Sequence, residues 1–462
     1  MQPCIRLPHR IKEGYGLKKH MVDELAAAGV TLLLTVDTGV TAGPEIAYAK
    51  EKKIDVIVLD HHHLPETLPT AYAVLHPSVV TSPMIPAPCG AGVAWSVVRG
   101  LEMACLPDRQ GDWNESAVDM ALAAIGTVAD VVPLKGGNRT LVHQGLAALQ
   151  TLPAGTLKLL CLQAGLEVPY RARDVAFRIA PRINAAGRMA DPAIALQALL
   201  GDGHALLQLE ELNRARQESV AGYIEELLPR AEKLTTPFLC FADERFSPGI
   251  CGLLAGKLTE RFGKPSLVAC VEGETCVASL RSIPSYHVME GLLRTSKHLT
   301  GFGGHAMAAG CSFLHKNFEA LAMMLQEDLH QRVAPALLTP SLRADMVIAP
   351  EHLTMELRGQ LECLEPYGEG NPEPRFVLPG IRLQDVRTVG KTFAHLQGSA
   401  KGHKIIGFGL GDLLSHLNEP VDLLCRMGID TWQGARRLQL FVDDIRIAEK
   451  VQVQRQSAGM YK

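Results

Sequence analysis

The segment VIVLDHHHLPE, residues 56–66, places four side chains that can bind metal directly behind an apolar run. These side chains belong to Asp60, His61, His62 and His63. Carboxylate and imidazole ligands with room for water suit Mn²⁺, Mg²⁺ or Zn²⁺. A single histidine in a polar loop is usually a hydrogen-bonded loop residue, but three histidines after an aspartate at a strand end favour a metal site.

Asp37 ends a second apolar run, GVTLLLTVDTG, in the same way. Ligands of an open parallel sheet bind at the carboxyl ends of its strands, and neighbouring strands lie about 4.8 Å apart. Asp37 and the segment 60–63 can therefore share one ion. Taken alone, Asp37 would be a turn residue in DTG, and Asp130 in ADVVPL would be a loop cap.

The elements that must position these residues form a βαβ unit. The apolar runs predict parallel strands over 30–37 and 54–60, and AGPEIAYAKEKK, residues 42–53, predicts the helix between them, with Pro44 in its first turn. AYAVLHP predicts a third strand, and residues 115–134 predict a helix that breaks near Gly126 and leads to Asp130. The first region is therefore α/β.

The pattern of predicted helices and strands changes twice in the rest of the chain. Apolar residues at helical spacing predict one long helix over 204–233, which we interpret as a spacer between domains. A second α/β stretch follows it, to about residue 333. From residue 341, strand-like runs with few helices between them predict a small antiparallel barrel.

The composition is that of a globular chain of about three domains. Of the 462 residues, 47% are hydrophobic and 21% are charged, and the net charge of −3 argues against a surface coated in basic residues. The 11 cysteines form no C-x-x-C pair, so we expect reduced, mostly buried thiols. The opening sequence has no apolar core of a signal peptide, and we expect a cytoplasmic protein without a membrane segment.

Seven segments occur in one order along the chain: DTG, DHHH, GTVADVVPL with GNR, RINAAGRM, SLRSIP, FGGHAMAAG and LEPYGEGNPEP. In this order they resemble the RecJ family, the single-strand-specific 5′ to 3′ DNA exonucleases of the DHH phosphoesterase superfamily. The resemblance implies a DHH domain over 1–203 that lacks its first strand, a connecting helix over 204–234, an α/β DHHA1 domain over 235–334 and an OB-type barrel over 341–450.

The resemblance also implies a site that hydrolyses a phosphodiester with two metal ions, Mn²⁺ or Mg²⁺. Asp37 would bridge both ions, and His61 and Asp130 would complete the second metal site. His62 would contact the scissile phosphate, and Asp60 would orient its neighbours. The third histidine of the run lies outside the family motif and is expected to be a bystander.

Further residues resemble family positions that hold nucleic acid. Several of them are arginines, and arginine binds phosphate in a bidentate fashion. ASLRSIP would hold a phosphate near the 5′ end, although Leu280 replaces a family glycine there. GFGGHAMAAG would form a phosphate-binding glycine turn with a histidine at its tip. The residues assigned to these roles are Arg10, Arg188, Ser279, Arg281, Gly303, Gly304 and His305.

The sequence departs from the family pattern at its start, and this difference affects the expected activity. The family opens with a strand ending in a DxDxDG-type motif, and this sequence begins at the segment that follows it. The first metal site would then lack its own carboxylates, and hydrolysis would be impaired. A fragment, a misplaced start, half of a split protein and a relative without catalysis are four readings of this departure.

The expected function is metal-dependent hydrolysis of single-stranded DNA from its 5′ end in repair and recombination. The resemblance implies single-strand-binding protein and repair helicases as partners. The alternative is a catalytically silent DHH scaffold that binds DNA or a replication or repair partner. A phosphoesterase of short oligonucleotides is a third reading, which the long spacer and the barrel disfavour.

Overall fold

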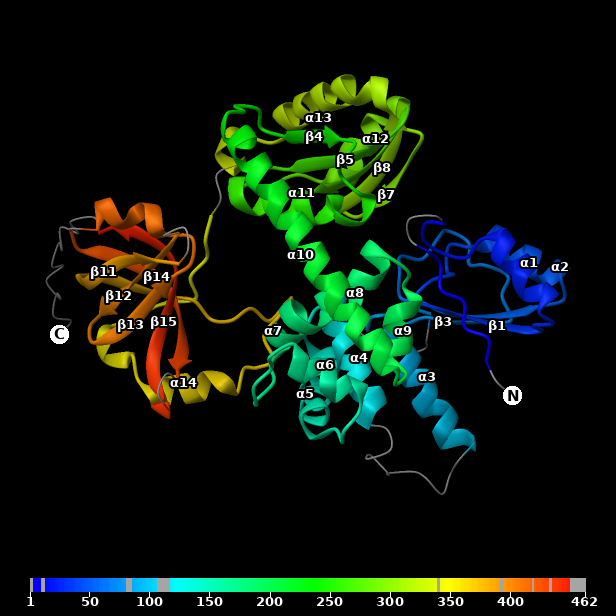
Figure 1. Ribbon diagram of the computed structural model, residues 1–462, viewed down its shortest axis with the longest axis horizontal. Helices are drawn as coiled ribbons and strands as arrows, with labels where there is room; N and C mark the ends of the chain where they lie inside the picture. The colour runs from blue at the N-terminus through cyan, green and yellow to red at the C-terminus, as the bar shows by residue number, and fades with distance from the viewer. Residues whose placement is uncertain are drawn as a thin grey trace, which may run out of the picture. The chain divides into compact units, whose positions relative to one another are not determined.

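The computed structural model describes residues 3–9, 13–79, 85–105, 117–338, 341–390, 394–417, 419–431 and 434–448. The chain divides into two compact units, Met1–Pro340 and Ser341–Lys462 (Figure 1). The first unit combines a parallel sheet, a helical layer and a mixed sheet, and the second is built around one further sheet. The predicted α/β class with a strand-rich C-terminal domain is therefore confirmed.

The N-terminal sheet contains the three predicted strands, and they pair in parallel in the order β1-β2-β3. Its registers pair Val36 with Leu59, so the ends of the first two strands lie side by side. Val56 and Val58 point into a core formed with the two helices that precede and follow the first strand. The elements are α1 (Lys19–Ala27), β1 (Leu32–Val36), α2 (Gly43–Glu51), β2 (Asp55–Leu59) and β3 (Ala73–Leu75).

A helical layer follows this sheet and contains the largest apolar core of the first unit. Its elements are α3 (Gly90–Cys105), α4 (Ala117–Ala129), α5 (Gly136–Thr151), α6 (Thr156–Gln163), α7 (Ala172–Asp174), the π-helical turn Val175–Ile179, α8 (Ala180–Met189) and α9 (Ala193–Leu199). The prediction of a break near Gly126 is wrong, because α4 continues through this residue. A Cβ at Gly126 would lie 2.5 Å from the Cβ of Ala91, so the glycine lets α3 pack closely against α4.

The predicted long helix is confirmed as α10 (Gly203–Glu232). Asp202 caps its start, since the carboxylate accepts hydrogen bonds from the N–H groups of His204 and Ala205. Its first half packs on the helical layer through Leu206 and Leu209, and its second half packs on the next sheet through Leu227. The helix therefore connects the core of the helical layer to that of the mixed sheet, and Figure 1 shows it running from one to the other.

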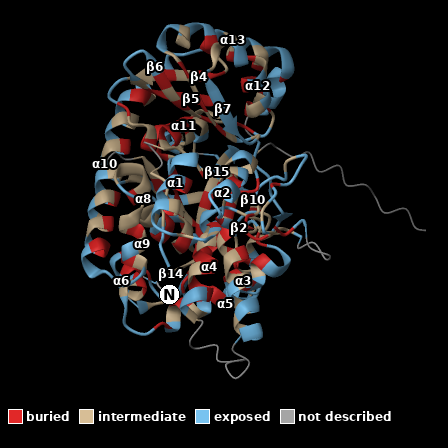
Figure 2. Cartoon of the chain, turned by 90° about the vertical axis from the view of Figure 1, so that its right-hand side faces the viewer, coloured by how far each residue is buried: buried red, intermediate tan, exposed pale blue. Residues whose placement is uncertain are grey.

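The second α/β region is a five-stranded mixed sheet in the order β4-β5-β6-β8-β7. Strand β5, which lies next to the edge strand β4, is almost entirely buried (Figure 2). β4 pairs parallel with β5, and the other pairs are antiparallel. The elements are β4 (Leu239–Asp243), α11 (Pro248–Phe262), β5 (Ser266–Glu272), β6 (Thr275–Arg281), α12 (Val288–Arg294), β7 (Gly301–Gly304), β8 (Ala308–Leu314) and α13 (Phe318–Arg332).

An ion-pair network on α13 makes the stability of this region depend on pH. Burial alone would raise the pKa of Asp328, but Arg294, Tyr286 and Arg332 all donate to its carboxylate and lower the pKa below its usual value. A carboxyl whose folded pKa lies below its unfolded pKa stabilises the fold above the unfolded pKa, and this stabilisation disappears as the pH falls through the folded pKa.

Asp328→Asn should therefore melt about 5 °C lower than the wild type at pH 7, because it weakens charge-assisted hydrogen bonds. The difference should shrink as the pH falls below about 4, where the unfolded carboxyl protonates. Calorimetric melts of both proteins from pH 7 to pH 3 measure it. A difference that stays constant over this range would show that the charge of Asp328 does not stabilise the fold.

The C-terminal unit contains a seven-stranded sheet in the order β11-β12-β13-β15-β14-β10-β9. Most pairs are antiparallel as predicted, but β13 pairs parallel with β15 and β9 pairs parallel with β10. The strand-like runs of the sequence correspond to β9, β11, β13, β14 and β15, whereas β10 and β12 were not predicted. The elements are β9 (Met346–Val347), α14 (Met355–Glu362), β10 (Phe376–Ile381), β11 (Leu383–Val389), β12 (His395–Ala400), β13 (His403–Gly407), β14 (Val421–Asp430) and β15 (Arg437–Ile447).

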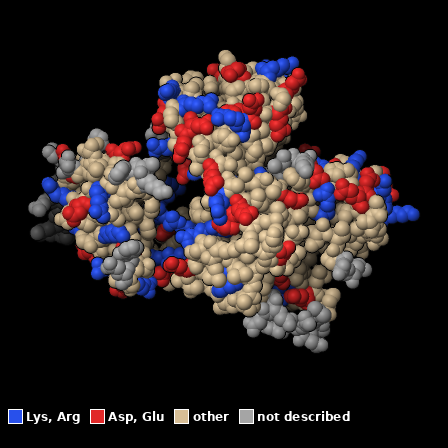
Figure 3. All heavy atoms as spheres, viewed as in Figure 1, with Lys and Arg blue, Asp and Glu red and all other residues tan. Residues whose placement is uncertain are grey.

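Acidic and basic side chains are interspersed on the face shown in Figure 3, in agreement with the net charge of −3. Within the described ranges, no single helix is both long and apolar enough to cross a bilayer. The helices α5 and α6 pass that test only together, by length and composition, with a bend of 94° between them.

Candidate metal centre and phosphate-binding residues

Asp37 follows β1 at the edge of the sheet where the strands end. Its backbone has a φ of 60°, a left-handed conformation that is uncommon for a residue other than glycine, and its N–H donates to the carbonyl of Leu59 at 2.9 Å. A Cβ at Gly90 would collide with the carboxylate and the Cβ of Asp37. The first residue of α3 must therefore be glycine for Asp37 to take this position.

Asp60 lies one strand away and is buried. Its carboxylate accepts hydrogen bonds from the N–H groups of Val40, His61 and His62, at 2.9, 2.8 and 3.2 Å, and lies 2.7 Å from Nδ1 of His62. Burial would raise the pKa of Asp60, but the hydrogen bonds from His62 and from the backbone together lower it to about 2. Asp60 thus holds the loop between the strand end and the histidines as a fixed anion.

His61 turns its Nε2 atom toward two carboxylates. This atom lies 3.1 Å from Oδ1 of Asp37 and 3.5 Å from Oδ2 of Asp130. It is buried and makes no hydrogen bond within the described part of the chain. An imidazole nitrogen without a hydrogen-bond partner, facing two carboxylates, fits a divalent cation such as Mn²⁺ or Mg²⁺.

Asp130 reaches the same place from the end of α4. Burial raises the pKa of Asp130, and the negative charge of Asp37 adds to this increase. Nδ2 of Asn138 donates to the carbonyls of Ala87 and Pro133, at 2.9 and 3.2 Å. This amide joins the segment before α3 to the turn after α4, so it ties both carboxylates to one scaffold.

His62 is half exposed beside this cluster. The hydrogen bond to Asp60 raises the pKa of His62, and burial partly opposes the shift. One ligand atom each of Asp37, His61 and His62 lie within 4.8 Å of one another. The buried His76 fixes the loop from behind, since its Nε2 lies 2.8 Å from the carbonyl of His62.

Arg188, Ser279 and Arg281 gather around the start of α11. Nη1 of Arg188 donates to the carbonyl of Gly249 at 3.2 Å, and a Cβ at Gly249 would collide with the Arg188 backbone. Ser279 and Arg281 point to the same face of β6 because they are two residues apart. A Cβ at Gly252 would lie 2.9 Å from Nη2 of Arg281 and 3.5 Å from Oγ of Ser279.

Leu280 does not obstruct this face. Its side chain is fully buried in the core on the opposite side of β6, because strand residues alternate. Leu280 therefore does not project into the space beside Ser279 and Arg281.

In the segment GFGGHAMAAG, the turn does not lie at the glycines. Gly303 and Gly304 belong to strand β7, and the chain turns after them, where the N–H of His305 donates to the carbonyl of Ala308 at 2.8 Å. The rings of His305 and His63 lie 5.7 Å apart, so the structure brings two distant motifs together. Arg10 lies outside the described residues.

The sequence analysis missed three residues that shape these sites: Gly90, His76 and Gly252. Each acts through contacts with a segment distant in sequence, and none belongs to a run of similar residues. The only local signal was at Gly252, whose segment FSPGICG opens a helix with glycines three residues apart.

Comparisons with known proteins agree with this architecture. Three family models match the chain in order: the DHH family, N-terminal domain, over residues 4–125, the DHHA1 domain over residues 233–331, and the RecJ OB domain over residues 344–444. The fold and the strand-end cluster thus define a protein of the DHH class.

Individual relatives narrow this class. The single-stranded-DNA-specific exonuclease RecJ of Escherichia coli is 33% identical over 95% of this chain and 81% of the relative. RecJ of Bacillus subtilis is 32% identical over 96% of this chain but only 57% of the relative, so this chain spans little more than half its length. The crystal structure of Thermus thermophilus RecJ with Mn²⁺ matches 94% of this chain and 64% of that chain, with a TM-score of 0.82 and 31% identity. The chain belongs to the RecJ family.

Proposed function

We propose that this chain hydrolyses single-stranded DNA from the 5′ end with the help of Mn²⁺ or Mg²⁺. The observation that carries the proposal is the buried Nε2 of His61, which faces Asp37 and Asp130 without a hydrogen bond. Crystal structures of Thermus thermophilus RecJ with Mn²⁺ and with Mg²⁺ support the choice of ions.

In this proposal Asp37, His61 and Asp130 hold the ion. When bound there, it would supply charge neutralisation at the phosphate and a more acidic water molecule. His62 contacts the scissile phosphate, and Asp60 orients the imidazole through the 2.7 Å contact with its Nδ1. The hydrogen bond to Asp60 favours the protonated, positively charged form of His62, which suits a phosphate ligand.

A second group of residues would hold the phosphate at the 5′ end. Arg188, Ser279 and Arg281 meet beside the first turns of α11, where a guanidinium fork can bind phosphate oxygens. His305, at the β7–β8 turn, would contact a phosphate closer to the metal centre, since its ring lies 5.7 Å from the ring of His63. The OB domain would add contacts to the strand, mainly through backbone phosphates.

The position of Arg281 predicts a role for Gly252. In Gly252→Ala the new methyl group must displace the guanidinium, and the loss of one charged hydrogen bond should weaken binding of a 5′-phosphorylated single strand about tenfold. Gly256→Ala is the matched control, because a Cβ there would lie 4.0 Å from Cγ of Arg281, an ordinary contact. Fluorescence anisotropy with both variants tests this. Equal affinities of the two variants would contradict it.

A DHH scaffold that binds DNA or a repair partner without hydrolysis is the second candidate. It is favoured by one observation: the described residues contain a single cluster of metal-capable side chains, whereas a two-metal reaction needs ligands for two ions. For the same reason we infer that hydrolysis by this chain is slower than that of longer relatives.

The direction of degradation can be measured with one substrate. A 5′-phosphorylated single strand with 2-aminopurine as its first nucleotide and a dye at its 3′ end is incubated with Mn²⁺ and the protein. We expect free 2-aminopurine nucleotide before any loss of the 3′ dye, and no release from the same strand in a blunt duplex. Early loss of the 3′ dye, or cleavage inside the strand, would overturn the assigned polarity.

A further inference from the structure

Strand β4 forms one edge of the mixed sheet. It pairs with β5 along one side only, and no strand of the described chain lies along the other. The N–H of Leu239 donates to the carbonyl of Pro265, so the backbone groups of residues 239, 241 and 243 point toward β5. Those of Cys240 and Ala242 must therefore point outward.

The outward groups at the start of the edge are already occupied, but those further along are not. The carbonyl of Phe238 accepts hydrogen bonds from the side chains of Gln326 and Thr236, at 3.4 and 3.2 Å. Within the described residues, no hydrogen bond reaches the outward N–H and C=O groups of Cys240 and Ala242. These four groups can bind an added strand.

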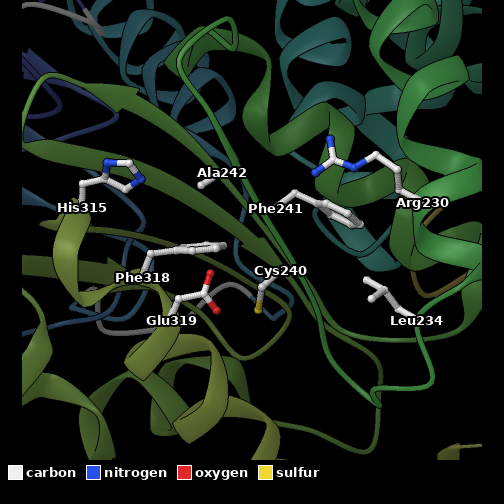
Figure 4. Close-up of a pocket in the computed structure, with 8 residues that line it drawn as sticks. All are labelled: Arg230, Leu234, Cys240, Phe241, Ala242, His315, Phe318 and Glu319. Carbon is white, nitrogen blue, oxygen red and sulfur yellow. The ribbon is translucent and has the colours of Figure 1, made fainter.

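A cavity of about 410 Å³ lies along this edge and has walls on both faces of the sheet (Figure 4). Its floor is β4 itself. Arg230, in the last turn of α10, and Leu234, just after this helix, form one wall. Phe318 and Glu319, at the start of α13, form the other, with His315 beside them. Side chains of an added strand alternate between the two faces, so one set would meet each wall.

The walls carry charges that lack ion-pair partners among the described residues. The guanidinium of Arg230 lies 5.3 Å from the centre of the Phe241 ring and makes no ion pair there. The neighbouring Asp243 is already bound by Arg245 at 2.8 Å. Glu319, on the opposite wall, is exposed. The groove therefore offers a cation on one side and an anion on the other.

This charge pattern argues against a second copy of the chain. If two copies of the chain paired their β4 strands antiparallel about a twofold axis, each face of one sheet would lie next to the same face of the other sheet. Arg230 would then face Arg230, and Glu319 would face Glu319, which is repulsive. A nucleic acid backbone would meet Glu319 as well, whereas a peptide can place an acid and a base on opposite sides of its strand.

We propose that the outer edge of β4 is a docking site for an extended peptide of a protein partner, which pairs with Cys240 and Ala242 and places an acidic side chain against Arg230. Backbone hydrogen bonds would provide affinity, and the two walls would select alternate side chains. This site needs neither the metal centre nor DNA, so its test does not depend on the proposed hydrolysis.

A library of random nine-residue peptides displayed on phage, selected on the full chain, tests this proposal. Ala242→Pro serves for counter-selection, because it removes an outward N–H and proline is tolerated when that group faces solvent at a strand edge. Arg230→Glu reverses the charge of one wall. Arg261→Glu, an exposed position on α11 away from the cavity, is the matched control. Unchanged melting temperatures confirm that all variants fold.

We expect peptides enriched in acidic residues that bind wild type and Arg261→Glu but at least about tenfold more weakly to Ala242→Pro and Arg230→Glu, which corresponds to one charged hydrogen bond. Selection on Arg230→Glu should instead favour basic residues. Peptides that bind all four proteins equally, or no enrichment on wild type over Ala242→Pro, would overturn the proposal. So would weaker single-stranded DNA binding by Arg230→Glu without any peptide enrichment, since the groove would then hold nucleic acid.

Discussion

Asp37→Asn should bind Mn²⁺ at least about 100-fold more weakly than the wild type, because the loss of a charged ligand at a metal costs several kcal/mol. The substitution keeps the shape of the side chain and its position against Gly90 but removes the negative charge that faces Nε2 of His61. Isothermal titration calorimetry measures the affinity directly, without DNA and without turnover.

Asp55→Asn is the matched control for this experiment. Asp55 is exposed at the start of β2, at the opposite edge of the same sheet, and the substitution changes the net charge equally. It should bind Mn²⁺ like the wild type. If Asp37→Asn and Asp55→Asn titrate alike, the strand-end cluster is not the metal centre.

Arg281→Ala should weaken binding of a 5′-phosphorylated single strand by about 10- to 100-fold, the equivalent of one charge-assisted contact of 1.5–3 kcal/mol. The same strand with a 5′-hydroxyl should lose much less affinity if, as proposed, Ser279 and Arg281 hold the terminal phosphate. Each lost phosphate contact on a single strand should also reduce the slope of log K against log salt by about 0.7.

Arg173→Ala provides the comparison, since Arg173 is exposed on α7 and the change in charge is the same. It should leave the preference for a 5′-phosphate unchanged. If Arg281 only stabilises its own domain, Arg281→Ala should lower the melting temperature and weaken the binding of both strands equally. That result would remove Arg281 from the phosphate site.

The metal-capable side chains could be predicted from the sequence because a parallel sheet brings consecutive strand ends to one edge. Two apolar runs of the right length and a helix between them were enough to place Asp37 near His61. The roles of Gly90 and His76 could not be predicted in this way. Gly90 acts on Asp37, 53 residues earlier, and depends on how α3 enters the sheet edge, which no local pattern encodes.

At Gly126 the sequence predicted a helix break that the structure does not contain. A glycine inside a helical pattern was interpreted as a break, because it lowers helix propensity by about 1 kcal/mol. In the structure α4 continues through Gly126, and a glycine is required there because the helix packs closely against Ala91. In the C-terminal unit, β10 contains Pro379 and Gly380, and β12 is largely polar, so pairing with neighbouring strands rather than composition defines both.

The most direct test of the central claim is a turnover assay with wild type and Asp37→Asn on the same 5′-phosphorylated single strand, with Mn²⁺ present or chelated, alongside a measurement of DNA affinity. We predict nucleotide release by the wild type that requires Mn²⁺, and no release by Asp37→Asn even when the strand is bound with similar affinity. Binding of the strand by both proteins without release by either, at any Mn²⁺ concentration, would contradict hydrolysis and support the scaffold. Equal release by both would contradict the assigned metal centre.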